Sequence, residues 1–146
     1  MPFQYFFHKN NPWRTALNEK KVVVLDMNEQ HSKALCTMLE AKQYHAVPMR
    51  SLDNIQGYIQ KHNCLAVILD VDNESVHNRS IRQLTVDNPG VYFFVMSQRS
   101  YNPELEESIC YHIYACLNKP VDQDEMFYWL RSIEENHAAP NNRIVP

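Results

Sequence analysis

The chain has 146 residues, which is enough for about one domain. Hydrophobic residues make up 45% and charged residues 21%, as in an ordinary globular protein with a core. The formal net charge is −3 and no basic run is longer than Lys20-Lys21, which argues against direct binding of nucleic acid. No apolar run reaches the length of a membrane span, and the N-terminus lacks the pattern of a signal peptide. We therefore expect a cytoplasmic protein with no membrane partner.

The content of glycine and cysteine excludes two further classes of site. The chain has two glycines, so it has no glycine-rich loop of the kind that cradles phosphate in P-loop and dinucleotide-binding enzymes. The four cysteines lack the paired spacing of a structural zinc site. They are Cys36, Cys64, Cys110 and Cys116. We interpret them as buried free thiols in a reducing compartment.

The first half of the chain alternates between expected strands and expected helices. Residues 21–25 are mostly apolar and predict a strand buried on both faces. A helix follows, with Asn28 as its N-cap. Residues 46–48 predict a weak strand, which the proline places at an edge of the sheet. Ser51 then caps a second helix, and residues 65–69 predict a second buried strand.

The second half continues the same alternation. A short helix carries Ile81 and Leu84 on one face, and residues 91–96 predict a third buried strand. The motif Asn102-Pro103-Glu104 is typical of a helix start. Residues 113–117 predict another strand. The last helix begins at Asp122, which has capping-box spacing to Glu125, and runs through Ile133.

Five such strand–helix units predict an α/β fold with a parallel sheet and helices on both of its faces. Four polar residues lie at or just after the carboxyl ends of the expected strands. They are Asp26, Asp70, Ser97 and Lys119. Because sites in open α/β sheets form at that edge, the four residues are candidates for one site. Taken singly, Asp26 could instead cap a helix, and Lys119 could be a structural ion-pair partner of Asp70.

Between residues 21 and 134 the sequence resembles the receiver domain of two-component response regulators. Four segments carry the resemblance: Val22-Val23-Val24-Leu25-Asp26, Ala66-Val67-Ile68-Leu69-Asp70, Phe93-Phe94-Val95-Met96-Ser97 and Leu117-Asn118-Lys119-Pro120. Each motif is weak alone, but their order and the Lys-Pro after the last strand make the set specific. The resemblance implies a flavodoxin-like five-stranded parallel sheet in the order 2-1-3-4-5.

The resemblance also implies a chemistry for the site. Asp70 would accept a phosphoryl group from a histidine kinase or phosphotransfer protein, and Lys119 would supply a cation to the phosphoryl oxygens. Ser97 would bind the phosphoryl group and move its loop, which switches an interaction surface. Asp26, Asp70 and the backbone carbonyl of Asp72 would hold Mg²⁺. The chain would then be a regulatory domain and not an enzyme.

Two residues depart from the pattern of the family. The family has a second acid after the first strand, where this chain has Met27, and a thioether is a poor ligand for Mg²⁺. The family usually has an aromatic residue at the position of Cys116, three residues before Lys119. We therefore expect weak Mg²⁺ binding, which Asp72 or Glu29 could partly compensate.

These departures leave a second function open. The chain could be a pseudo-receiver that acts as an interaction or dimerisation module without phosphorylation. A third class, a flavodoxin-like cofactor binder, is disfavoured because the acidic, glycine-free loop at residues 26–30 would repel a flavin phosphate.

The flanking segments add expectations about partners. Residues 1–20 form an extension rich in aromatic residues, which we expect to dock on the domain or on a second copy. Residues 127–129 are Phe-Tyr-Trp, and three consecutive helical side chains cannot all face a core. An exposed aromatic there favours a homodimer through the last strand and helices. Residues 135–146 are expected to be a tail or linker.

Overall fold

The computed structural model describes residues 20–72, 76–98 and 113–138. The strands are β1 (Lys21–Leu25), β2 (His45–Met49), β3 (Cys64–Asp70), β4 (Tyr92–Ser97) and β5 (Ala115–Asn118). The helices are α3 (Glu29–Ala41), α4 (Asp53–Lys61), α5 (Asn78–Asp87) and α7 (Gln123–Ala138). Among the residues described, no helix combines the length and the apolar character needed to cross a bilayer.

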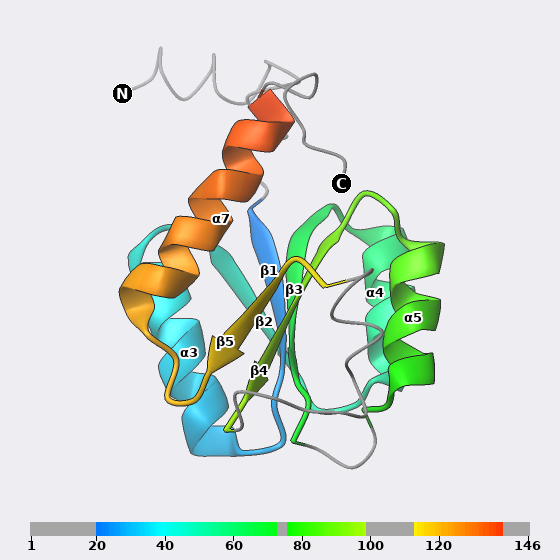
Figure 1. The fold of residues 1–146 in the computed structure, drawn as a ribbon, viewed down its shortest axis with the longest axis horizontal. Coiled ribbons are helices and arrows are strands. Elements are labelled where there is room, and N and C mark those ends of the chain that lie inside the picture. The colour runs from blue at the N-terminus through cyan, green and yellow to red at the C-terminus, as the bar shows by residue number, and fades with distance from the viewer. Residues whose placement is uncertain (1–19, 73–75, 99–112, 139–146) are drawn as a thin grey trace.

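The five strands form one parallel sheet in the order β2-β1-β3-β4-β5 (Figure 1). This order confirms the predicted fold class. β2 lies at one edge, as the proline in it predicted, because Pro48 has no N–H to donate to a second neighbour. β3 is central, and its residues from Leu65 to Asp70 are all buried.

The side chains of the strands alternate between two cores, one on each face of the sheet. Apolar residues of α3 and α7 pack on one face against Val22, Ile68 and Phe94. Apolar residues of α4 and α5 pack on the other face against Val23 and Phe93. Both faces of the sheet are therefore covered (Figure 1), which explains why the strand sequences are continuously apolar.

Local capping agrees with the sequence patterns at the starts of α3 and α7. The Asn28 side chain accepts a hydrogen bond from the His31 backbone N–H at the start of α3. At α4 the predicted cap lies one residue too early: Leu52 is the N-cap, although the Ser51 hydroxyl accepts a hydrogen bond from the Asp53 backbone N–H at 3.2 Å. The Asp122 carboxylate accepts from the second and third residues of α7. These three contacts set where the helices begin and thus how the preceding loops leave the sheet.

Some boundaries and exposures differ from the expectation. The α7 helix continues to Ala138, so the boundary placed after Glu134 falls inside it. Tyr128 is 59% exposed while Phe127 is buried, which confirms the predicted exposed aromatic. Cys116 is exposed rather than buried; along the edge strand β5 it alternates with the buried Ala115 and Leu117.

Several predictions fall on parts of the chain that the structure does not describe. They are the extension at residues 1–19, the helix start at residues 102–104, Cys110 and the end of the tail at residues 139–146.

Candidate functional site

The parallel sheet brings the predicted polar residues to one edge. Asp70 is the last residue of β3 and Ser97 the last residue of β4, while Asp26 and Lys119 directly follow β1 and β5. The Lys119 backbone N–H donates to the Ser97 carbonyl at 2.9 Å, which continues the pairing of β4 with β5. The strand register alone therefore places these residues on a common rim.

The centre of the rim is an ion pair between Asp70 and Lys119. The Lys119 ammonium donates to Asp70 Oδ1 at 2.6 Å, and the two side chains are 14% and 10% exposed. The Asp72 backbone N–H donates to the same oxygen at 3.0 Å. No hydrogen bond is described to the second oxygen of Asp70, Oδ2, within residues 20–72, 76–98 and 113–138.

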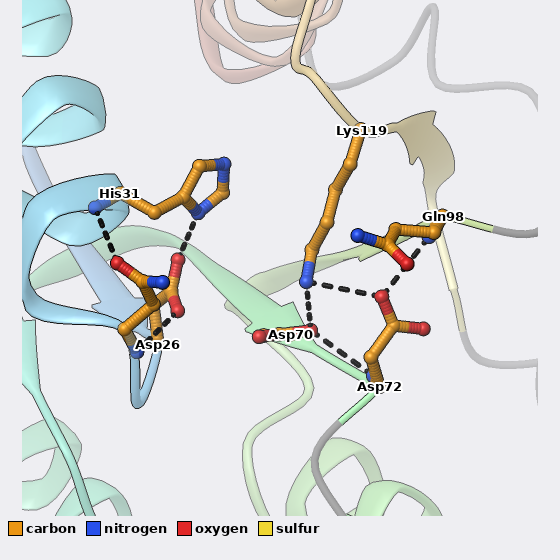
Figure 2. A network of polar contacts seen from close by, with 7 residues as sticks. Asp26, His31, Asp70, Asp72, Gln98 and Lys119 are labelled. Carbon is orange, nitrogen blue, oxygen red and sulfur yellow. Dashed lines mark hydrogen bonds and ion pairs between the residues drawn. The ribbon is translucent and has the colours of Figure 1, made fainter.

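A second carboxylate, that of Asp72, lies beside this pair (Figure 2). Its Oδ1 accepts from the Ser97 hydroxyl at 2.9 Å. Its Oδ2 accepts from the Gln98 backbone N–H and lies 3.0 Å from the Lys119 ammonium. The prediction assigned Asp72 a role through its backbone carbonyl, whereas the structure gives its side chain three contacts.

These contacts shift two pKa values. Burial alone would raise the pKa of the Asp72 carboxyl, but hydrogen bonds from Lys119, Gln98 and Ser97 outweigh it and lower the pKa below its ordinary value. Burial alone would lower the pKa of the Lys119 ammonium, but Asp70 and Asp72 outweigh it and raise the pKa. Asp72 and Lys119 are thus both held in their charged forms near neutral pH.

We expect the wild type to lose more unfolding free energy than an Asp72→Asn variant as the pH falls from about 5 to about 2. The folded pKa of Asp72 lies below its ordinary value of 3.8, so its stabilising effect is present above that value and is lost as the pH falls through the folded pKa. Urea unfolding of both proteins across this range checks the prediction. An equal fall in the free energy of unfolding of the two proteins over this range would contradict the prediction.

Asp26 forms a separate pair on the same rim. Its side chain is fully buried, and it contacts the His31 imidazole through Oδ2. The Asn28 backbone N–H donates to its Oδ1 at 2.9 Å. In Figure 2 this pair lies on one side of the view, and the group of Asp70, Asp72 and Lys119 lies on the other. The alternative that Asp26 caps the first helix is wrong, because Asn28 is the N-cap of α3. Asp26 instead accepts from the backbone of the turn before the helix and contacts His31, a partner that the sequence did not indicate.

The carboxylates on this rim fit a tight Mg²⁺ site poorly. Asp26 is paired with His31, and both Asp70 and Asp72 contact Lys119. No group of three or more acidic, histidine or cysteine side chains suited to a metal occurs in the part of the chain that the structure describes.

Two residues that follow Asp26 closely in the chain, Met27 and Glu29, do not improve the fit. Met27 is 50% exposed and carries a thioether. Glu29, considered as a compensating ligand, is 83% exposed in its side chain and lies 3.7 Å from Arg50.

Sequence reasoning missed two contributions to the rim. His31 lies in the first turn of α3, five residues after Asp26, and only that spacing could have suggested the contact. Gln98 contributes through its backbone N–H. Every residue except proline has this group, so the sequence gives no signal for the contact.

The chain has the fold of a response-regulator receiver domain. Its structure matches the signal receiver domain of an HD domain-containing protein from Pseudomonas fluorescens at 17% identity, with a TM-score of 0.72 over 82% of this chain and 98% of that chain. A CheY-like receiver domain protein from Methanospirillum hungatei matches at 12% identity, with a TM-score of 0.72 over 82% and 97% of the two chains.

A response regulator from Thermotoga maritima matches at 17% identity, with a TM-score of 0.69 over 78% of this chain and 96% of that chain. No protein-family model matches the sequence, and no curated protein matches it. At these identities the likeness establishes the fold, and the function has to be argued from the residues of the rim.

Proposed function

We propose that the protein is a signalling receiver that accepts a phosphoryl group on Asp70 and thereby switches a protein-interaction surface. The observation that carries this proposal is the Asp70–Lys119 pair, which places a nearly buried carboxylate 2.6 Å from an ammonium at the carboxyl end of the central strand. The fold shared with receiver domains supports it.

In the proposed reaction an Asp70 oxygen attacks the phosphorus of a phosphohistidine on a histidine kinase or phosphotransfer protein. A new O–P bond forms, and the N–P bond breaks with its electron pair returning to the imidazole nitrogen. Lys119 stabilises the negative charge of the transferred oxygens. Ser97 lies one strand away and can donate its hydroxyl to the acyl phosphate.

The remaining parts of the proposal concern partners and cofactors. Mg²⁺ would bind weakly, since a thioether stands at residue 27 and the carboxylates of the rim already have partners. The exposed Tyr128 on α7 supports a homodimer through the last strand and helices. The chain would act in the cytoplasm as a regulatory domain without an enzymatic substrate of its own.

Incubation with acetyl phosphate and Mg²⁺ tests the proposal directly. We expect intact-mass spectrometry to show an adduct of one phosphoryl group on the wild type and none on Asp70→Asn, because the amide lacks the nucleophilic oxygen. Asp87→Asn is the matched control, since Asp87 is an exposed acid at the end of α5, just before β4 begins. An adduct that persists in Asp70→Asn would place the reaction elsewhere and contradict the proposal.

One observation favours the second candidate, a pseudo-receiver that works without phosphate. The Ser97 hydroxyl and the Gln98 N–H both donate to Asp72, and Asp26 is paired with His31, so the rim is already satisfied within the chain. The same experiment separates the two functions. Absence of an adduct on the wild type at every Mg²⁺ concentration would reject the phosphorylated receiver and leave the interaction module.

A further inference from the structure

Three different donors converge beside the Asp70 carboxylate. They are the Lys119 ammonium, the Ser97 hydroxyl and the Gln98 backbone N–H, and they come from the ends of two neighbouring strands. A tetrahedral oxyanion attached to Asp70 would need a cation and neutral donors of this kind around its oxygens. The donors are thus suited to a phosphoryl group.

In the structure all three donors contact a single carboxylate, that of Asp72. Asp72 Oδ1 accepts from Ser97, and Oδ2 accepts from Gln98 and Lys119, at distances of 2.9 to 3.0 Å. The backbone of Asp72 is held at the same time, because its N–H donates to Asp70 Oδ1. Figure 2 shows the Asp72 side chain directed toward Gln98 and Lys119 from the end of β3.

We propose that the Asp72 carboxylate is an internal substitute for the phosphoryl group. It holds Ser97, Gln98 and Lys119 together in the unmodified protein, and it has to leave them before a phosphoryl group on Asp70 can take the same donors. Asp72 is in this sense a positioning residue, which acts through the donors and not on the reacting phosphorus. The part of the inference that concerns phosphorylation rests on the proposed function.

Two consequences follow from this arrangement. The ionised Asp72 carboxylate repels an incoming phosphodonor and occupies the hydrogen-bond donors that the phosphoryl group would use. Removal of this carboxylate should therefore speed the phosphorylation of Asp70. Its removal should also free the end of β4, since Ser97 and Gln98 lose their contact with residue 72. The second consequence does not depend on any phosphoryl transfer.

The test uses Asp72→Ala, with Asp87→Ala as the matched loss of an exposed acid. Asp72→Ala keeps the backbone N–H that donates to Asp70. We expect the acetyl phosphate adduct to form about tenfold faster than in the wild type, which corresponds to about 1.4 kcal/mol in the barrier. We also expect hydrogen exchange of the Gln98 amide to become about fivefold faster without phosphodonor. Asp87→Ala should match the wild type in both measurements.

The possible results distinguish this inference from the proposed function. Faster exchange at Gln98 with no adduct in any protein would support the internal substitute and reject phosphorylation. An unchanged Gln98 exchange rate in Asp72→Ala would overturn the inference, and so would slower adduct formation. Asp72→Asn keeps the size of the side chain but has one acceptor oxygen instead of two, so it cannot accept from Ser97 on one side and from Gln98 and Lys119 on the other. It serves in the same measurements if the alanine variant does not fold.

Discussion

Replacement of Met27 by aspartate is expected to raise the affinity for Mg²⁺ by about tenfold or more. Met27 directly follows Asp26 on the rim, and its side chain is 50% exposed, so the change removes little core packing. A carboxylate supplies the oxygen ligand that Mg²⁺ prefers, whereas the thioether supplies none.

Isothermal titration with Mg²⁺ measures the effect. The matched control is Val86→Asp, which adds the same charge at a side chain that is 60% exposed near the end of α5. That position precedes β4 and therefore lies toward the amino-terminal ends of the strands, whereas the rim lies at their carboxyl ends. A double variant, Met27→Asp with His31→Ala, removes the competing imidazole. If neither variant binds Mg²⁺ more tightly than Val86→Asp, the residue at position 27 does not limit Mg²⁺ binding and the prediction is wrong.

Replacement of Phe94 by alanine is expected to lower the free energy of unfolding by about 3–5 kcal/mol. Phe94 is fully buried on β4, where it packs in the core under α3 and α7. Its ring stacks on that of Tyr114, with the ring centroids 5.9 Å apart. Since small domains have a total stability of about 5–15 kcal/mol, this loss removes a large share of it.

Urea unfolding monitored by circular dichroism measures the loss. Tyr128→Ala is the matched control, because it also deletes an aromatic ring, but from a side chain that is 59% exposed on α7. We expect that variant to stay within about 0.5 kcal/mol of the wild type. Equal losses in the two variants would contradict the assignment of Phe94 to the core.

Much of the fold was predictable from the pattern of apolar residues. The strand at residues 65–69 is apolar at every position because helices cover both faces of the sheet there, and the structure places β3 at its centre. Pro48 marked an edge strand because it lacks an N–H. Asn28 marked a helix start because its side chain can accept from the first turn.

The convergence of Asp70, Ser97 and Lys119 was predictable for a similar reason. Each residue follows an apolar strand, and the carboxyl ends of parallel strands share one edge. The direction of a side chain beyond that edge was not predictable. Asp72 was assigned a backbone role, yet its carboxylate contacts Ser97, Gln98 and Lys119, which lie 25 or more positions later in the chain.

The sequence by itself therefore determined the class of fold, the rim and the residue types on it, because these depend on local periodicity and strand order. Only the tertiary structure decided that Asp26 pairs with His31 and that Asp72 takes the donors beside Asp70. Such pairings depend on where the loops after β1 and β3 direct their carboxylates. That direction is set by hydrogen bonds to backbone groups such as the Gln98 N–H, which every residue except proline carries and which no sequence pattern distinguishes.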